Sequence, residues 1–191
     1  RLQQAVTDVR FGGNSSATRM QMAVAGASEL IVGQLVTGEW FEALGVDAAE
    51  GRVLGPADTR TLGGQPVMVL SHDLWRKRFA SNPAIVGTTV NLNQVPVTIV
   101  GVAARGFSGV SVGSRIDAWI PVTMQAELRF MGNAASEDAD TRKPWVPQDG
   151  VSFLTVIARL PDGPARPAAI SGMAHVHRQD VETKARKEPD P

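Results

Sequence analysis

Several short motifs of this 191-residue chain contain residue types that could carry out catalysis. The most specific is "GVSVG" at residues 109–113, which has the Gly-x-Ser-x-Gly spacing of a hydrolase nucleophile elbow and would make Ser111 the nucleophile. An elbow works because a strand delivers the serine to a sharp turn and a helix begins at once, presenting backbone N–H groups to the oxyanion. The flanking stretches "AARGFS" and "SRIDAWIP" predict a loop and a strand instead. We therefore expect Ser111 to be a loop residue, and an esterase built on it is the weakest functional hypothesis.

The consecutive residues Ser71, His72 and Asp73 contain the three residue types of a hydrolytic triad. A working triad is assembled from distant segments so that each group can hydrogen-bond the next, whereas adjacent helical residues point about 100° apart. Ser71 directly precedes a helical pattern, and Leu70 and Trp75 have the spacing of a hydrophobic staple. We therefore expect Ser71 to cap a helix rather than to act as a nucleophile.

The pair His175 and His177 could suggest a metal site near the end of the chain. Residues two positions apart in a helix are separated by about 200° around its axis, so these two imidazoles cannot share a metal there. The apolar spacing instead places His177 on the packed face of the predicted helix, together with Ile170, Met173 and Val181. No metal site is predicted.

Cofactor and nucleic-acid binding are also disfavoured by the sequence. Residues 101–108 begin like a phosphate loop but carry Phe107 where the phosphate-binding lysine is required. Glu137, Asp138 and Asp140 lack the further acidic residues and the glycine that a calcium loop needs. The 19 basic residues balance 19 acidic ones, so no net positive field attracts nucleic acid, and the absence of cysteine excludes thiolate sites.

The sequence predicts a mixture of strands, helices and loops around these residues. Within the hairpin predicted at residues 88–102, Asn93 and Gln94 form the turn, although glycine would be preferred at the second position. No apolar run approaches the roughly 18 to 20 residues that a membrane-spanning helix needs. The other predicted elements are strands within 19–36, at 67–70, 115–122 and 152–160, helices at 39–45, 71–79 and from 167 onward, and long loops at 51–66 and 131–150.

The order of these segments resembles the MacB-type periplasmic core domain of ABC transporter permeases. The resemblance is carried by "LVTGEWFEALGVDAAEGR", "PVMVLSHDLWRKRFASNPAIVGTTVNLNQVPVTIVGVAARGFSGV", "DAWIPV" and "LTVIARLPDG", and it covers roughly residues 30–175. Three departures are visible. Trp40 stands where another aromatic is usual, Gln94 replaces the turn glycine, and the last strand expected after the C-terminal helix is absent.

The resemblance implies an α+β fold with two subdomains. A discontinuous porter-like β-α unit would be built from residues 1–50 and 150–191, and residues 51–149 would form an inserted mixed α+β subdomain. The stretches "ELIVGQLV" and "SFLTVIARL" are apolar on two faces, so we expect them to pair with each other in the first subdomain.

The resemblance also implies a non-catalytic role, with no catalytic, cofactor or metal residues. Members of the family lie between the first and second transmembrane helices of a permease, on the extracytoplasmic side of the bacterial membrane. There the domain would couple cytoplasmic ATP hydrolysis to export or mechanical work. The implied partners are a second copy of the permease, a cytoplasmic ATP-binding subunit or domain reached through the transmembrane region, and a periplasmic adaptor, with no nucleic acid.

Loop placement alone predicts that Phe107, Trp119 and the loop 131–150 are exposed and face partners. The alternative function is a free-standing extracytoplasmic module that binds a ligand in a cleft between the subdomains. Transmembrane segments on both sides in the parent gene would favour the permease, and their absence would favour the module.

Overall fold

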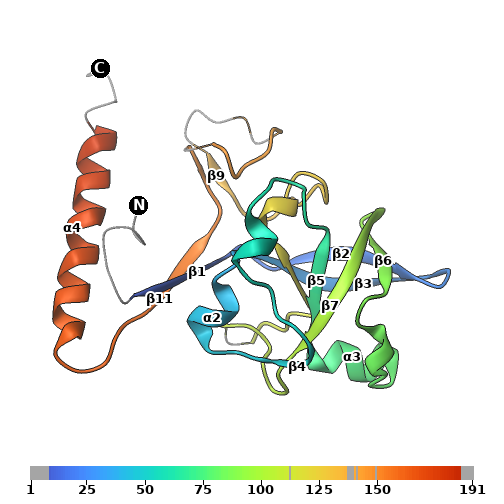
Figure 1. The fold of residues 1–191 in the computed structure, drawn as a ribbon. Coiled ribbons are helices and arrows are strands. Elements are labelled where there is room, and N and C mark those ends of the chain that lie inside the picture. Colours follow the sequence, from blue (N-terminus) through green and yellow to red (C-terminus); the bar gives the residue numbers. More distant parts are fainter. Residues whose placement is uncertain (1–8, 112, 137–139, 141, 149, 186–191) are drawn as a thin grey trace. The chain divides into compact units, whose positions relative to one another are not determined.

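The computed structural model describes residues 9–111, 113–136, 140, 142–148 and 150–185. The chain forms two compact units (Figure 1). The larger unit is the continuous stretch from Gly12 to Val156, and the smaller unit joins the N-terminal residues up to Phe11 to the residues from Ile157 onward. Strands and helices occur in both units, so the predicted α+β class is confirmed.

A closed barrel of six strands forms the centre of the larger unit. The hydrogen-bonded order is β3-β2-β6-β7-β5-β8, and β8 pairs a second time with β3, which closes the ring. The closing pair is parallel, with Gly33 opposite Ala118, while β8 runs antiparallel to β5. The barrel strands are β2 (Thr18–Val24), β3 (Ala27–Val36), β5 (Val67–Leu70), β6 (Thr89–Leu92), β7 (Val95–Ala103) and β8 (Ala118–Pro121).

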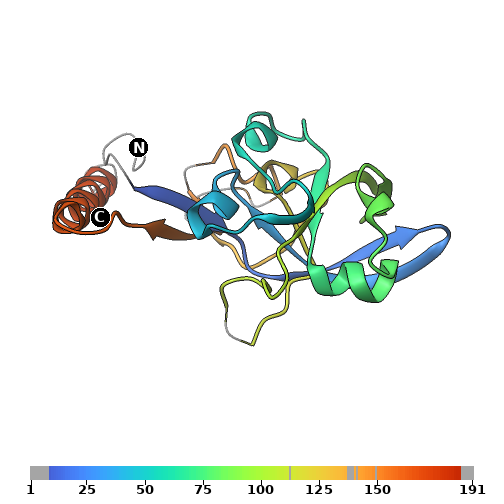
Figure 2. The ribbon, with the colours of Figure 1, turned by 60° about the horizontal axis from the view of Figure 1, so that its bottom comes forward.

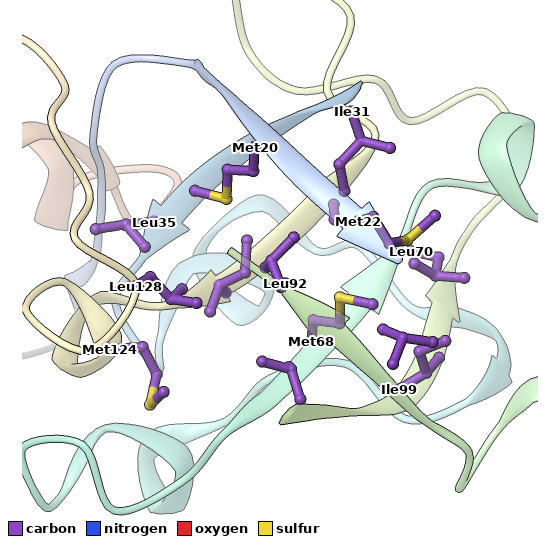
Figure 3. Close-up of a cluster of buried hydrophobic side chains, with 14 of the residues drawn as sticks. Met20, Met22, Ile31, Leu35, Met68, Leu70, Leu92, Ile99, Met124 and Leu128 are labelled. Atoms are coloured by element: carbon purple, nitrogen blue, oxygen red, sulfur yellow. The ribbon is translucent and has the colours of Figure 1, made fainter. Parts of the chain in front are cut away.

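The barrel interior is filled by alternate residues of these strands, as the two-residue period of a strand requires. In β2, for example, Met20 and Met22 are fully buried while Gln21 between them is exposed. Figure 3 shows these side chains meeting others from β3, β5, β6 and β7. Gly33 leaves room for the Met20 thioether, because a Cβ atom at this position would lie 2.5 Å from its sulfur.

Two tight turns connect neighbouring barrel strands. Ala25 and Gly26 both have positive φ between β2 and β3, and Asn93 and Gln94 do so between β6 and β7, which is the type I′ pattern of two-residue hairpins. The predicted hairpin at residues 88–102 is therefore confirmed. Figure 2 shows the β2–β3 hairpin, in blue, extending beyond the other strands of its unit.

Two short helices cover parts of the larger unit where the sequence predicted them. Helix α2 (Trp40–Leu44) ends at Gly45, whose φ of 66° is left-handed. Helix α3 (His72–Phe79) begins at Ser71, whose Oγ accepts a hydrogen bond from the Leu74 N–H at 3.1 Å. The remaining elements are β4 (Ala48–Gly51), β9 (Ala135–Ser136), β10 (Val151–Ser152) and the 3-10 turns Pro56–Thr59, Pro83–Ile85 and Val122–Met124.

The smaller unit contains the first residues of β1, the last residues of β11 and a long helix. β1 (Arg10–Asn14) and β11 (Thr155–Arg159) are neighbours in the sheet, and α4 (Ala165–Ala185) follows β11. Ala169 of α4 is buried beside Val9 and contacts the half-buried side chains around it, Phe11, Leu160 and Met173.

The predicted packed face of the C-terminal helix is right for Met173, which packs beside Ala169, but wrong for Ile170 and His177. Ile170 is 47% exposed and His177 is exposed, whereas Ala169 is 5% exposed. The side chain of Val181 lies outside the described residues. Small and apolar residues occur on several sides of α4, so periodicity did not define one buried face.

The predicted direct pairing of "ELIVGQLV" with "SFLTVIARL" is also wrong. β1 lies between β11 and β3, whose other edge pairs with β8. An apolar pattern on two faces indicates burial, but it does not identify the neighbouring strand. The chain divides into its two units after Phe11 and after Val156, and the division at residues 50 and 150 stays a prediction about the folding units.

Candidate functional site

Ser111 lies in the long connection between β7 and β8. Ser111 is exposed, and its carbonyl accepts a hydrogen bond from the Ser114 N–H at 3.1 Å. Gly109 and Gly113 on either side have positive φ. The described part of this connection, residues 104–111 and 113–117, contains turns and bends without strand or helix, so the predicted loop position of Ser111 is confirmed.

Ser71, His72 and Asp73 are engaged with three different neighbours. Ser71 caps α3 as predicted, and the His72 ring packs edge-on against Trp75 with centroids 5.4 Å apart. Asp73 forms an ion pair with Arg115 at 3.4 Å. The three side chains are not linked to one another by any hydrogen bond among the described residues.

Phe107 and Trp119 belong to an aromatic cluster on the outside of the barrel. Their rings stack with centroids 5.0 Å apart, and Phe41 from α2 contacts both. Trp119 is completely buried, so its predicted exposure is wrong: its strand β8 lies between β3 and β5, and α2 and the Phe107 loop cover its outer face. Phe107 is half-buried, and its contact with a partner stays a prediction.

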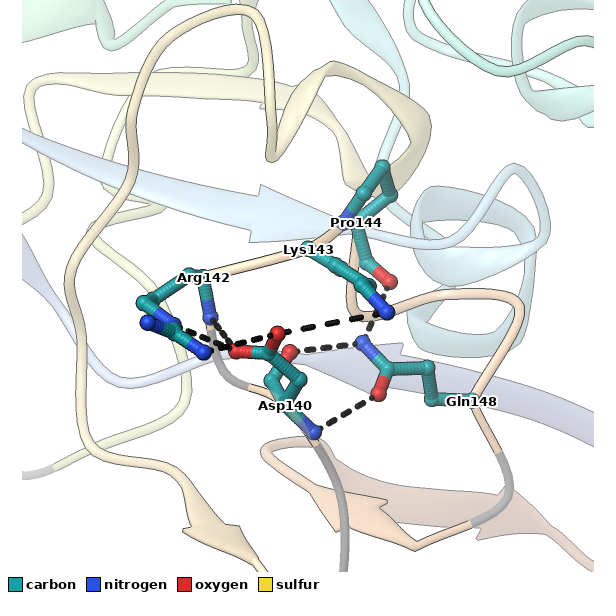
Figure 4. Close-up of polar contacts among 5 residues, drawn as sticks. All are labelled: Asp140, Arg142, Lys143, Pro144 and Gln148. Atoms are coloured by element: carbon teal, nitrogen blue, oxygen red, sulfur yellow. Dashed lines mark hydrogen bonds and ion pairs between the residues drawn. The ribbon is translucent and has the colours of Figure 1, made fainter.

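The loop 131–150 is partly described, and Glu137 and Asp138 lie outside the described residues. Figure 4 shows hydrogen bonds that join Asp140 to Gln148 within this loop. The Asp140 N–H donates to Gln148 Oε1 at 3.1 Å, and Gln148 Nε2 donates to the Asp140 carbonyl at 3.0 Å. Hydrogen bonds from the Arg142 guanidinium and N–H lower the pKa of the Asp140 carboxyl. Partner contact by this loop stays a prediction.

His175 and His177 are both exposed on α4. In the part of the chain that the structure describes, no group of three or more His, Asp or Glu side chains is arranged to hold a metal ion.

A polar cleft of about 670 Å³ is the largest concave feature that we describe in the larger unit. Its floor is formed where β1 passes into β2 and by Gln34 of β3, and Ser111 stands at its rim. Three further stretches of the chain complete its lining: Val110, Ser111, Ser114 and Ile116 before β8, then residues 133–135 and residues 152–155. Sequence reasoning missed this cleft, and its one visible signal is a glutamine inside the otherwise apolar run "ELIVGQLV".

Two buried amides are fixed in the floor of the cleft by a single carbonyl group. Asn14 Nδ2 and Gln34 Nε2 donate to the Ser15 carbonyl at 3.0 and 2.8 Å. A carbonyl only accepts, so these bonds determine which end of each amide is nitrogen. The amide oxygens, Asn14 Oδ1 and Gln34 Oε1, have no hydrogen-bond partner among the described residues.

A protein-family model matches the sequence over most of its length. The model of the MacB-like periplasmic core domain matches residues 3–175. The macrolide export ATP-binding/permease protein MacB of Burkholderia thailandensis is 28% identical over 102 residues, which cover 52% of this chain and 15% of that protein. The protein of the same name from Hahella chejuensis is 26% identical over 135 residues, covering 71% and 18%. The chain thus spans less than a fifth of these relatives.

Solved structures of related transporters have a fold similar to that of this chain. The periplasmic region of MacB from Actinobacillus actinomycetemcomitans superposes with a TM-score of 0.60 at 13% identity, covering 98% of this chain and 79% of that one. The extracellular domain of the noncanonic ABC-type transporter YknZ from Gram-positive bacteria gives 0.58 at 14% identity, covering 94% and 78%. None of the helices within the described residues has the length and apolar character to cross a membrane. With a family match over most of its length and this fold, the chain belongs to the MacB-like periplasmic core domains, the extracytoplasmic domains of ABC transporter permeases.

Proposed function

We propose that this domain transmits movement, driven by cytoplasmic ATP hydrolysis, to partners outside the membrane, and that it is not itself an enzyme. The permease would work as a dimer with a second copy of itself. A cytoplasmic ATP-binding subunit or domain would act through the transmembrane region, and a periplasmic adaptor is a further partner. Membership of the MacB-like family supports this role.

The observation that carries the proposal is the way the chain passes between the two units. β1 includes the boundary at Phe11 and Gly12, and β11 includes the boundary at Val156 and Ile157. Both connections are therefore strands, and these strands are neighbours in the sheet. A displacement of the chain ends would therefore be transmitted to the barrel by the hydrogen-bonded strands β1 and β11, and not by flexible loops.

Ala158 offers a test of this coupling, because it is an exposed residue of β11 outside the barrel. Ala158→Pro cannot donate to the strand ladder, whereas Ala158→Val keeps the N–H and favours a strand. In the full-length parent permease, we expect Ala158→Pro to reduce export while ATP hydrolysis continues, and Ala158→Val to preserve both. Macrolide efflux is the first export assay to apply, because the curated relatives are named for it. Equal export by the two variants would contradict the proposal.

The non-catalytic part of the proposal has a separate test on the isolated domain. Hydrolysis of p-nitrophenyl esters should equal the buffer rate, and Ser111→Ala should leave it unchanged. Calorimetric titration with Mg-ATP should give no heat of binding. Ester turnover that disappears in Ser111→Ala would show that the domain is an enzyme.

A further inference from the structure

The polar cleft is uncharged. None of the described residues that line it has an acidic, basic or imidazole side chain. Its polar groups are amides and hydroxyls, and its apolar wall includes Ile116 and the half-buried Phe153 ring. An ionic ligand would lose its hydration without gaining an ion pair, so the lining selects neutral ligands.

Two buried amide oxygens in the floor of the cleft lack hydrogen-bond donors among the described residues. Asn14 and Gln34 are 5% and 4% exposed, and both amide nitrogens are already committed to the Ser15 carbonyl. The two amide oxygens therefore remain as buried acceptors that have no donor among the described residues. A buried acceptor without a donor destabilises the protein, so a donor supplied from the cleft is favoured.

The walls of the cleft offer groups that both donate and accept. No hydrogen bond joins the hydroxyls of Ser114, Ser152 or Thr155 to another described residue. Phe153 also lines the cleft, and its ring packs edge-on against Trp145 with centroids 5.2 Å apart. Hydroxyls, amides and one aromatic face match a ligand that carries many hydroxyls on a compact apolar frame.

We propose that this cleft binds a neutral sugar, with ligand hydroxyl or acetamido N–H groups donating to Asn14 Oδ1 and Gln34 Oε1. A peptide strand is disfavoured because it would need a free strand edge. The edges of β3 at the cleft are occupied by β1 and β2 on one side and β8 on the other. The volume of about 670 Å³ lies within the range of small-molecule sites.

Both amide oxygens are shielded from solvent in this structure, so sugar binding must draw the amides toward the cleft. The side-chain NH2 resonances of Asn14 and Gln34 therefore report on the site directly. The inference uses the extracytoplasmic location of the domain but not its coupling to ATP hydrolysis. A failure of one proposal leaves the other standing.

The test is an NMR titration of the 191-residue protein with triacetylchitotriose and with maltotriose at tens of millimolar. We expect shifts of both amide side chains and of residues 152–155. A response to both sugars assigns the donors to hydroxyls, and a response to triacetylchitotriose alone assigns them to acetamido groups. Ser152→Trp should fill the cleft from an exposed position and weaken binding at least tenfold, while Ser171→Trp, on α4 and outside the cleft, should not.

Three results would overturn the proposal. The first is the absence of shifts with either sugar. The second is equal affinity in Ser152→Trp and the unmodified protein, which would place binding elsewhere. The third is tighter binding of N-acetyl-trialanine amide at the same resonances, which would make the cleft a peptide site.

Discussion

Trp119 of β8 stacks on Phe107 of the connection between β7 and β8, with ring planes inclined by 27° and centroids 5.0 Å apart. The contact fixes the start of the loop that leads from β7 to β8 against the outer surface of the barrel. It also explains why a tryptophan next to a loop is completely buried.

The contributions of Phe107 and Trp119 to the free energy of unfolding should depend on each other. Trp119→Ala should lower the free energy of unfolding by about 3–5 kcal/mol, because a fully buried indole is removed. Phe107→Ala should cost less, and a double-mutant cycle in urea should give a coupling of about 0.5–1.5 kcal/mol. Pairing Trp119→Ala with Phe79→Ala, on α3, should give additive effects. Additivity of Phe107 and Trp119 would show that the stack contributes nothing beyond burial.

Trp75 should be an anchor of the barrel core. It is 7% exposed, lies in the same cluster as Leu70, and donates from Nε1 to the Asn82 carbonyl at 2.9 Å. Trp75→Ala should cost about 3–5 kcal/mol, whereas Leu62→Ala, on an exposed loop, should cost under about 0.5 kcal/mol. Chemical unfolding followed by circular dichroism measures both. A loss below about 1 kcal/mol for Trp75→Ala would mean that the site collapses around the missing ring.

Asp58 should contribute to stability at neutral pH and lose this contribution in acid. Burial opposes its ionisation, but two hydrogen bonds from Arg52 at 2.6 and 2.8 Å and one from the Gly55 N–H outweigh burial and lower the pKa of the carboxyl. A lowered pKa stabilises the fold above the unfolded value of about 3.9, and the effect disappears as pH falls through the folded value.

Unfolding free energies between neutral pH and strong acid check this expectation. At neutral pH, Asp58→Asn should be about 1–3 kcal/mol less stable than the unmodified protein, and the difference should shrink below about pH 4. Arg52→Met leaves the carboxylate buried without its partner, so acid should penalise this variant less than the unmodified protein. If the difference in unfolding free energy between Asp58→Asn and the unmodified protein did not change with pH, the ion pair would contribute nothing to stability.

Gln94 occupies a left-handed position with φ of 71°. Gln94→Gly should raise the free energy of unfolding by up to about 1 kcal/mol, because glycine adopts this conformation without strain. Asn93→Gly should have the opposite effect, since Asn93 Oδ1 accepts from the Gln21 N–H and Nδ2 donates to the Leu128 carbonyl. Thermal unfolding distinguishes the two variants. A destabilising Gln94→Gly would mean that the glutamine side chain stabilises the turn.

Hydrogen exchange should show which strands open together. The closed ring predicts that amides of residues 30–36 in β3 and 97–102 in β7 share one opening free energy, while β11 opens at lower cost. The division at residues 50 and 150 predicts instead that residues 30–36 exchange with residues 154–160. Native-state exchange at several denaturant concentrations separates the two outcomes.

Local signals in the sequence predicted the local structure. Ser71 as a helix cap, Gly45 as a helix end and the Asn93–Gln94 turn depend on neighbours within a few positions, and the structure confirms all three. The parallel pairing of β3 with β8 depends on residues far apart in the chain, and no pattern within either strand specifies it. The burial of Trp119 follows from this same pairing, so it was missed for the same reason.

The polar cleft was beyond sequence reasoning because five segments that are distant in the chain line it. Asn14 and Gln34 read individually as polar interruptions of apolar strands. Asn14 bonds the carbonyl of its neighbour Ser15, but the bond from Gln34 to the same carbonyl forms only once the chain around Ser15 lies beside β3. A single sequence contains no signal that relates the two amides.

The barrel cannot close until late in synthesis. The Val32 N–H donates to the carboxylate of Asp117, which lies 85 positions later in the chain and is therefore synthesised much later. At about 5–20 residues per second, translation of the intervening segment takes on the order of ten seconds. During this interval the unpaired edge of β3 can join other nascent chains, and contacts of such long range also slow folding itself. The edge of β3 that pairs with β8 therefore stays without its partner strand until residues 118–121 have been synthesised.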